Sequence, residues 1–145
     1  MEEIKMKFDL SETSKLFLKQ GLQNYNYSKN KYLNPKIYSI DKKYFGFYAY
    51  KNNEIIGGAY GFIEYENWVW LELLYVDSKY RGIDLGTKLI QSVENFAKEN
   101  NCVGMRTETW DVQAKGFYEK MGFVVYGQLE NHPVGAIDYH LKKVI

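Results

Sequence analysis

This 145-residue sequence has a single cysteine, no long apolar run and no apolar region at its N-terminus, and each shortage excludes a class of protein. It contains one cysteine, Cys102, so no internal disulfide can staple the chain. No apolar run approaches the roughly 18 residues that a membrane-spanning helix needs. The N-terminus, MEEIKMKFDL, lacks the apolar region of a signal peptide. We therefore expect a cytoplasmic protein with no membrane partner.

Charge and histidine content narrow the function further. The formal net charge is +1 at pH 7, which gives no electrostatic reason to expect a nucleic-acid partner. The two histidines, His132 and His140, have no sequence neighbours at the spacing of a metal site, so we expect structural or surface roles and no metal. Cys102 is expected to be a small buried apolar residue rather than a nucleophile.

The length and the aromatic content favour one ordinary domain, residues 1–145. A chain of this size buries roughly 68–70% of the surface that it exposes when unfolded, so it can form a core without staples. Aromatic residues make up 17% of the chain, with 14 tyrosines. Because tyrosine is amphipathic, some of these side chains are candidates to line a pocket or an interface, while the rest belong to core and strand surfaces.

The stretch Leu71–Ile90 has the most informative pattern. Leu71–Val76 is a short apolar run typical of a buried strand, the polar turn Asp77–Leu85 contains Gly82, and helical spacing follows. A strand that leads into a glycine-containing turn at a helix N-terminus presents free backbone N–H groups at the positive end of the helix dipole. This arrangement binds phosphate or pyrophosphate, although an ordinary strand-to-helix connection has the same pattern.

The turn lacks two common nucleotide-binding motifs and resembles a third. It has neither the Gly-Lys-Ser/Thr of a Walker A loop nor a G-x-G-x-x-G fingerprint. Over Val76–Thr87 it resembles the acetyl-CoA pyrophosphate loop of the GNAT superfamily of N-acetyltransferases, with the pattern Gln/Arg-x-x-Gly-x-Gly/Ala. Arg81 and Gly86 match that pattern, and Gly82 is also common in the family. Asp84 departs from it, because it stands where the family has its first glycine.

A second segment, Asp111–Phe123, is similar to the family's Asn-x-x-Ala-x-x-Phe/Leu-Tyr-x-Lys-x-Gly-Phe segment, with Asp111 in place of asparagine. The two segments occur in the family's order and spacing, and the resemblance covers roughly residues 45–125. It implies an α/β fold (an α+β mixed sheet), the GNAT-like acyl-CoA N-acyltransferase fold, with element order βα(α)βββαβαββ and helices on both faces. It also implies a single N-acetyltransferase domain.

The periodicity of the chain agrees with this order. It predicts, in sequence, a strand over Met1–Leu10, a helix over Glu12–Asn24, a helix or loop over Tyr25–Pro35, strands over Phe45–Tyr50, Ile55–Tyr65 and Trp68–Val76, a helix over Leu85–Asn100, a strand over Val103–Thr109, a helix over Gln113–Lys120, and strands over Phe123–Leu129 and Ile137–Lys142. Three glycines inside the second of the central strands, Gly57, Gly58 and Gly61, predict a bulge or the close approach of another group.

The resemblance assigns the residues that bind acetyl-CoA as co-substrate. The backbone of Leu74, Tyr75 and Val76 would pair with pantetheine like an added strand, and one of their N–H groups would serve as the oxyanion donor. The pyrophosphate would be held by the loop residues Arg81, Gly82, Ile83, Asp84, Leu85, Gly86 and Thr87. Further cofactor contacts are expected from Tyr118, Gln113 and Asp111, although for Asp111 we favour the role of helix cap.

Two residues are candidates for acid–base catalysis. Tyr118 matches the family tyrosine that hydrogen-bonds the sulfur of CoA, and a phenol is a suitable general acid for a leaving thiolate. Glu72 is the candidate general base, because period-2 counting places it beside Trp70 and Leu74 unless a bulge intervenes. A carboxylate among such side chains would have a raised pKa. Alternatively, Glu72 only positions a cationic amine or pairs with a cation.

The sequence leaves the acceptor open between a small-molecule amine and a protein amino group. Tyr25, Tyr27 and Tyr32 lie where the family builds its acceptor site and are candidate contacts. A different class of function, a non-catalytic CoA-binding sensor or interaction module, would follow if Asp84 and Asp111 marked a degenerate site. The last strands and the aromatic surface are candidate surfaces for a homodimer.

Overall fold

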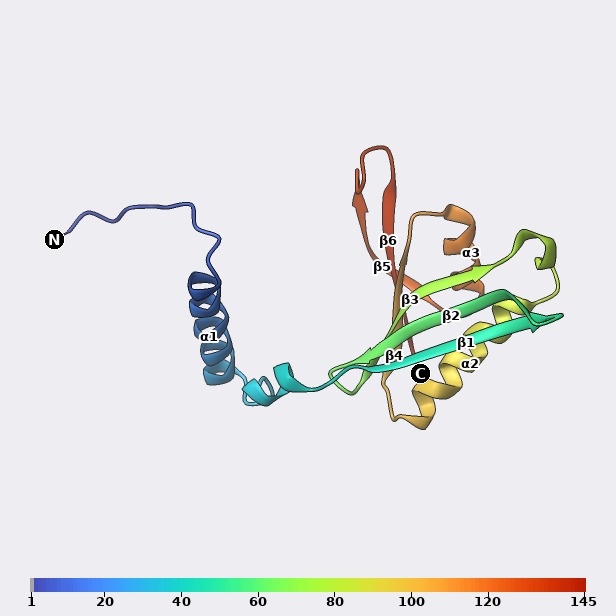
Figure 1. Cartoon of the computed structure of the whole chain (residues 1–145), viewed down its shortest axis with the longest axis horizontal. Helices are drawn as coiled ribbons and strands as arrows, with labels where there is room; N and C mark the ends of the chain where they lie inside the picture. Colours follow the sequence, from blue (N-terminus) through green and yellow to red (C-terminus); the bar gives the residue numbers. More distant parts are fainter. Residues whose placement is uncertain (1) are drawn as a thin grey trace. The chain divides into compact units, whose positions relative to one another are not determined.

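A computed structural model describes residues 2–145, and its chain divides into two compact units, Met1–Ile40 and Asp41–Ile145 (Figure 1). The single domain stays a prediction. In the first unit, helix α1 (Glu12–Lys29) precedes a short 3-10 helix, η1 (Pro35–Ser39). Ser11 caps α1 by accepting a hydrogen bond from the backbone N–H of Ser14. Helix α1 extends five residues beyond the predicted end at Asn24. The region Tyr25–Pro35, expected to be a helix or a loop, contains the end of α1 followed by a loop.

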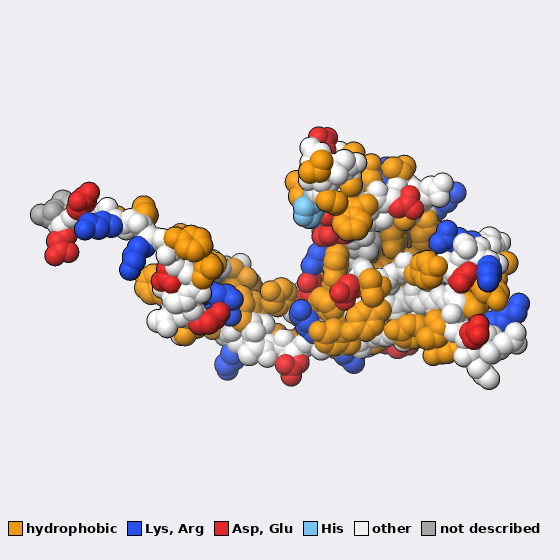
Figure 2. Space-filling model, turned by 45° about the horizontal axis from the view of Figure 1, so that its top comes forward, with side chains coloured by type: hydrophobic (Ala, Val, Ile, Leu, Met, Phe, Trp, Pro, Cys, Tyr) orange, Lys and Arg blue, Asp and Glu red, His pale blue; other side chains and the backbone are white. Residues whose placement is uncertain are grey.

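The predicted strand over Met1–Leu10 is wrong for residues 2–10, which form no strand; Met1 lies outside the described residues. The loose alternation of Ile4, Met6, Phe8 and Leu10 suggested a half-buried strand, but all four side chains are exposed. Alternation alone forms no ladder, because a strand also needs a neighbour to which it can hydrogen-bond. In Figure 2 hydrophobic side chains of this unit lie on its surface.

The second unit is built on a six-stranded sheet with the order β1-β2-β3-β4-β6-β5. The strands are β1 (Lys43–Lys51), β2 (Glu54–Glu64), β3 (Trp68–Val76), β4 (Gly104–Thr109), β5 (Val124–Glu130) and β6 (Ile137–Val144). Neighbours are antiparallel except β3 and β4, which are parallel, so the sheet is mixed as predicted. Between β3 and β4 lie the 3-10 helix η2 (Ser78–Tyr80) and helix α2 (Leu85–Glu99), and helix α3 (Val112–Lys120) follows β4.

The core lies between one face of the sheet and the two helices of this unit; we call this side the helix face. Helix α2 contributes buried apolar residues at helical spacing, and the strands contribute every second residue. The helix residues Phe117 and Tyr118 of α3 join the same cluster, and the α2 residue Gly86 lies against the Phe117 ring. Helices on both faces were predicted; within this unit α2 and α3 both pack on the helix face. Cys102 is buried, as expected.

A bulge interrupts the β2–β3 ladder at the predicted glycines. The register passes from Tyr60–Leu73 to Gly61–Leu71, so Glu72 is an extra residue on β3. A β-carbon on Gly61 would collide with the backbone carbonyl oxygen of Trp70, which explains why this position has no side chain. Within residues 2–145, none of the helices combines the length and apolar character needed to span a membrane.

Candidate functional site

The strands β3 and β4 part halfway along their length. They pair only from Trp68–Gly104 to Leu71–Thr107, although both strands continue beyond this point. The buried Thr107 hydroxyl donates a hydrogen bond of 2.9 Å to the Leu71 carbonyl and fixes the last paired position. Beyond it, β3 is paired with β2 on one side and has no ladder with any described strand on the other. Its free backbone groups there can accept an added extended chain.

The backbone of Leu74, Tyr75 and Val76 lies on this free stretch of β3. The side chains of Leu74 and Val76 pack against the core cluster on the helix face, so only their main chain is available to a ligand. Tyr75 is exposed. The predicted division of labour, with core side chains and a binding backbone, is compatible with this placement.

Tyr118 is placed beside the point where the strands separate. Its side chain is 5% exposed and packs between the rings of Phe117 and Phe123. Burial raises the pKa of Tyr118 to about 12, against a hydrogen bond with the Thr107 side chain that lowers it. Because Thr107 also holds Leu71, the Tyr118 hydroxyl is tied to the last paired position of β3 and β4. The phenol is therefore held in its protonated form at neutral pH.

The loop after β3 is shaped by its own side chains. Asp77 accepts a hydrogen bond of 2.9 Å from the Lys79 backbone N–H, and this begins η2. The Arg81 Nε donates to the Val76 carbonyl at 3.0 Å, and its guanidinium lies 5.9 Å from the centre of the Tyr75 ring. The cation predicted for the pyrophosphate loop thus lies against the end of β3. Gly82 has a φ of +83°, which favours glycine.

Asp84 takes the backbone conformation that a glycine would take. Its φ is +60° and its side chain makes no capping hydrogen bond, although it is the residue that precedes α2. The first-turn backbone N–H groups of α2, at Leu85, Gly86 and Thr87, therefore have no side-chain cap. Ile83 is exposed beside them. This free helix start has the chemistry to hold a phosphate group.

Asp111 is the N-cap of α3. Its carboxylate accepts a hydrogen bond of 2.9 Å from the backbone N–H of Gln113. The capping role favoured from the sequence is therefore confirmed, and a cofactor contact by Asp111 or Gln113 stays a prediction.

The surroundings predicted for Glu72 are wrong. Simple alternation placed Glu72 on one face with Trp70 and Leu74, but the bulge at Glu72 changes the phase of the strand. Leu74 packs on the helix face, whereas Trp70 lies on the opposite face beneath the Arg106 guanidinium, 4.4 Å from its ring centre. Glu72 itself is exposed. Glu72 therefore lacks the surroundings that simple alternation predicted, and its role as a base stays a prediction without that support.

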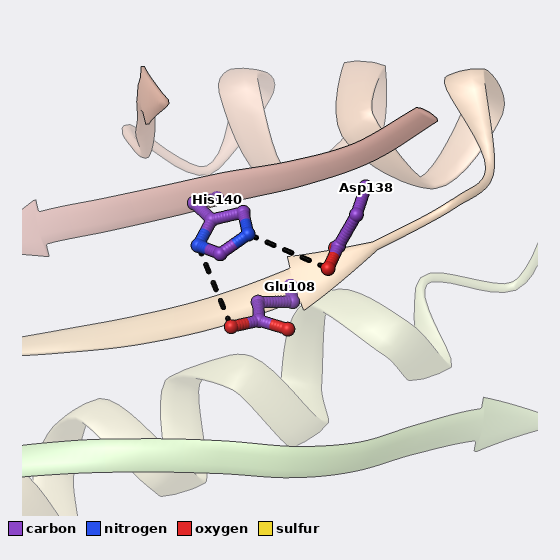
Figure 3. A group of neighbouring side chains, drawn as sticks. All are labelled: Glu108, Asp138 and His140. Atoms are coloured by element: carbon purple, nitrogen blue, oxygen red, sulfur yellow. Dashed lines mark ion pairs between the residues drawn. The ribbon is translucent and has the colours of Figure 1, made fainter. Parts of the chain in front are cut away.

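On the face opposite the helices, which we call the opposite face, Glu108, Asp138 and His140 gather (Figure 3). Figure 3 shows the His140 ring between the two carboxylates: Nδ1 is 3.4 Å from Glu108 Oε1, and Nε2 is 3.4 Å from Asp138 Oδ2. His132 Nδ1 also contacts Asp138 Oδ2, at 3.1 Å. For His140, the prediction that it has no metal-ligand partners is therefore wrong, since the β4–β6 register pairs it with Glu108. The absence of a metal stays a prediction.

A hollow of about 280 Å³ lies further along the opposite face. Arg106 and Glu64 line one wall of the hollow and form a bidentate ion pair, with a shortest N–O distance of 2.7 Å. Tyr126 lines the hollow, and its ring centre is 6.1 Å from that of His140. Neither the hollow nor the histidine cluster was predicted from the sequence, because the residues of each come from several strands. Of the expected acceptor contacts, Tyr25, Tyr27 and Tyr32 are exposed in the first unit.

Comparisons with known proteins agree on one family. A sequence profile described as the acetyltransferase (GNAT) family matches residues 11–123. Blasticidin-S acetyltransferase from Streptomyces morookaense is 36% identical over 94 residues, which are 64% of this chain and 68% of that protein.

Solved structures extend the agreement to the fold. An acetyltransferase from Bacillus cereus ATCC 14579 has a TM-score of 0.75 and 24% identity, covering 97% of this chain and 98% of that one. An acetyltransferase from Bacillus anthracis str. Ames, solved in complex with acetyl coenzyme A, has a TM-score of 0.66 and 29% identity, covering 72% of this chain and 64% of that one. The predicted α/β mixed-sheet fold is confirmed.

Proposed function

Because this chain belongs to the acetyltransferase (GNAT) family, we propose that it transfers the acetyl group of acetyl-CoA to a primary amine by direct attack in a ternary complex. Family membership makes the protein an acetyl-CoA-dependent acetyltransferase. The alternative, a non-catalytic CoA-binding module with a degenerate loop, is therefore set aside. The further points, namely the amine, the residues and the order of events, are our proposal.

The observation that carries the proposal is the parting of β3 and β4 beside Tyr118. An extended chain such as pantetheine can hydrogen-bond to the backbone groups of Leu74–Val76 that β2 leaves unpaired, apart from the Val76 carbonyl, which accepts from Arg81, and run into the gap. The loop residues Arg81–Thr87 lie at the end of the same strand, and the uncapped start of α2 fits the pyrophosphate. These features provide separate places for the two ends of one acetyl-CoA molecule.

Tyr118 acts at the leaving group as a hydrogen-bond donor. With a pKa raised to about 12, complete proton transfer to a thiolate whose conjugate acid has a pKa of about 8.5 would cost about 5 kcal/mol. Because the Thr107 hydroxyl gives its own proton to the Leu71 carbonyl, the Tyr118 O–H donates to Thr107 in the free enzyme. When acetyl-CoA is bound the phenol turns this O–H to the sulfur and, keeping its proton, stabilises the developing negative charge by donating to it. A backbone N–H of β3 stabilises the charge that develops on the carbonyl oxygen.

We propose a small-molecule amine as the acceptor. The similarity to blasticidin-S acetyltransferase supports this choice, as do the acidic groups and the hollow on the opposite face. Carboxylates attract a cationic amine, and the aromatic side chains Trp68 and Tyr126 of the hollow offer apolar contact to the rest of such a molecule. A protein amino group is the other acceptor to be tested.

The test begins with calorimetric titration of the protein with acetyl-CoA and with free CoA. We expect dissociation constants in the micromolar range, and no binding to folded protein would contradict the loop assignment. Thiol release is then followed with blasticidin S, a polyamine, an aminoglycoside and a peptide with a free N-terminus. Turnover with a small amine supports the proposed acceptor class, whereas turnover with the peptide alone would replace it by a protein acceptor.

A further inference from the structure

We propose that His140 is the general base that takes the proton from the acceptor amine, and that Asp138 and Glu108 hold its ring and the amine in place. The inference rests on the proposed acetylation of an amine. It assigns a catalytic role to residues on the opposite face of the sheet, to which the motif resemblance gave none.

The position of His140 follows from the register of the sheet. Leu71 and Thr107 form the last pair of β3 and β4, and Glu108 is the next residue of β4. The β4–β6 ladder pairs Glu108 directly with His140. Because residues in a strand rise about 3.3 Å each and strands lie about 4.8 Å apart, His140 lies within one residue and one strand of the point where the gap opens.

Tyr118 and His140 lie on the two sides of that gap. Side chains alternate along β4, so the buried Thr107 points to the helix face and Glu108 to the opposite face. Tyr118 reaches Thr107 from the helix face. A thioester that runs between the strands would then have its sulfur beside Tyr118, while its carbonyl carbon is open to an amine from the side of His140. Nucleophile and leaving group are thereby separated by the sheet.

The carboxylates of Asp138 and Glu108 differ in burial, and this difference indicates that Asp138 orients the His140 ring while Glu108 faces the amine. The Asp138 side chain is 5% exposed, and a buried carboxylate needs donors to hold its charge. The His132 Nδ1 lies 3.1 Å from Asp138 Oδ2 and the His140 Nε2 lies 3.4 Å from it, so both rings are within ion-pair distance of this carboxylate. The Glu108 side chain is 35% exposed and faces Nδ1. A neutral ring that carries its proton on Nε2, towards Asp138, keeps its Nδ1 lone pair on the side of Glu108, where an N–H of the neutral amine can donate to it.

The proton balance of the step is simple. The neutral amine nitrogen forms a bond to the carbonyl carbon of the thioester, and the bond from that carbon to sulfur breaks. The amine proton passes to Nδ1 of His140, and CoA leaves as a thiolate that accepts a hydrogen bond from Tyr118. The imidazolium donates to Glu108 and Asp138 together, then loses its proton to water. The products are the amide and CoA, with no other reactant.

The kinetic test compares His140→Gln with His132→Gln, a matched variant because both histidines contact Asp138. For the amine that the wild type acetylates, we expect His140→Gln to lower kcat by about 100-fold, since general base catalysis contributes about 10²–10⁴-fold. Added imidazole should restore part of this loss. The affinity for acetyl-CoA should stay the same in both variants, and His132→Gln should lower kcat by less than about ten-fold, because His132 contacts Asp138 but not the amine.

The pH profile separates a base from a structural residue. The charged and titratable groups around His140 are Glu108 from β4, Asp138 from β6, Tyr126 from β5 and, through shared contacts, His132 and Lys142. Among these residue types only histidine ordinarily titrates near neutral pH. We therefore expect the fall in wild-type kcat on the acid side to disappear in His140→Gln and to persist in His132→Gln.

Nitrogen-15 NMR of the histidine rings gives a reading that needs no turnover. At pH 8 the His140 ring should carry its proton on Nε2, and Asp138→Asn should abolish this preference. A ring protonated on Nδ1, or a His140→Gln enzyme with wild-type kcat and an intact acid limb, would overturn the inference. If the wild type binds acetyl-CoA but acetylates no amine, the proposed function itself fails and this inference falls with it.

Discussion

The two faces of the sheet at the Leu71–Thr107 position carry different kinds of information. On the helix face, the Tyr118 hydroxyl and the start of α2 belong to short continuous segments, so their sequence pattern can be recognised directly. On the opposite face, Glu108 and His140 are 32 residues apart in number and meet only through the β4–β6 register. Chemistry confined to one segment can be read from a sequence, whereas chemistry assembled by strand pairing requires the structure.

The same comparison divides the proposed reaction. The helix face is dry at Tyr118, which suits a group that must keep its proton and donate to sulfur. The opposite face is polar and partly exposed around His140, which suits a group that must exchange a proton with substrate and water. Substitutions on the helix face should therefore alter the handling of CoA, and those on the opposite face should alter the handling of the amine.

The largest effect expected on the helix face comes from Tyr118→Phe. Loss of the hydrogen bond to the developing thiolate should lower kcat by about 100-fold, or about 2.7 kcal/mol, as for the removal of one oxyanion donor. Acetyl-CoA affinity should change little, because the interaction strengthens only as charge develops on sulfur. Steady-state kinetics with calorimetry would measure both. Tyr139→Phe is the control, since Tyr139 packs against the same core; equal losses in both variants would indicate altered packing instead.

The raised pKa of Tyr118 also predicts a loss of stability in alkali. With a folded-state pKa of about 12 and an ordinary value of 10.0, the folded protein holds the proton more tightly than the unfolded chain. This contribution to stability is complete below pH 10 and is lost as pH rises towards 12, by up to about 2–3 kcal/mol. Urea unfolding at pH 8, 10 and 11 would test it. Equal pH dependence in wild type and Tyr118→Phe would show that Tyr118 is not responsible.

Most of the fold could be predicted from periodicity and turn residues. The six strands and the three α-helices of the described chain were predicted within a few residues, because apolar spacing and glycine or asparagine turns mark them locally. The strand expected over Met1–Leu10 failed because alternation says nothing about a pairing partner. The glycines Gly57, Gly58 and Gly61 indicated a bulge, but not which residue of β3 it would displace.

The candidate site, like the fold, could be predicted where its residues are close in sequence and not where strand pairing brings them together. The cap at Asp111 followed from its local sequence and is confirmed, whereas the roles of the loop Arg81–Thr87 and of Tyr118, which also rest on local motifs, stay predictions. Glu72 was misplaced because one extra residue at the bulge reverses the alternation beyond it. His140 was overlooked because its partners come from β4 and from the buried start of β6. These residues meet through the register between β4 and β6, and that register cannot be read from the sequence.

A smaller effect is expected from Asp84→Gly, which restores the family pattern in the loop. The change removes a carboxylate from the neighbourhood of the pyrophosphate and relieves a non-glycine residue at a φ of +60°. After screening, we expect acetyl-CoA to bind about 5- to 10-fold more tightly. Calorimetry would measure the change. Glu66→Gly is the matched control, because Glu66 is an exposed acid with a φ of +67° in the turn before β3; unchanged affinity in Asp84→Gly would mean that its side chain is directed away from the ligand.

The smallest effect is expected from Glu72→Gln. This variant distinguishes the Glu72 carboxylate from the His140 imidazole as the general base. If His140 is the base, Glu72 acts only as an exposed negative charge near the gap, and its loss should raise the KM of a cationic amine about three-fold. The acid limb of the kcat profile should stay, as it should in the control Glu54→Gln. If Glu72→Gln instead removes the acid limb of the kcat profile while His140→Gln keeps it, Glu72, the extra residue at the bulge of β3, is the general base. The division between the faces would then fail for catalysis, because the strand that binds the cofactor would also supply the base.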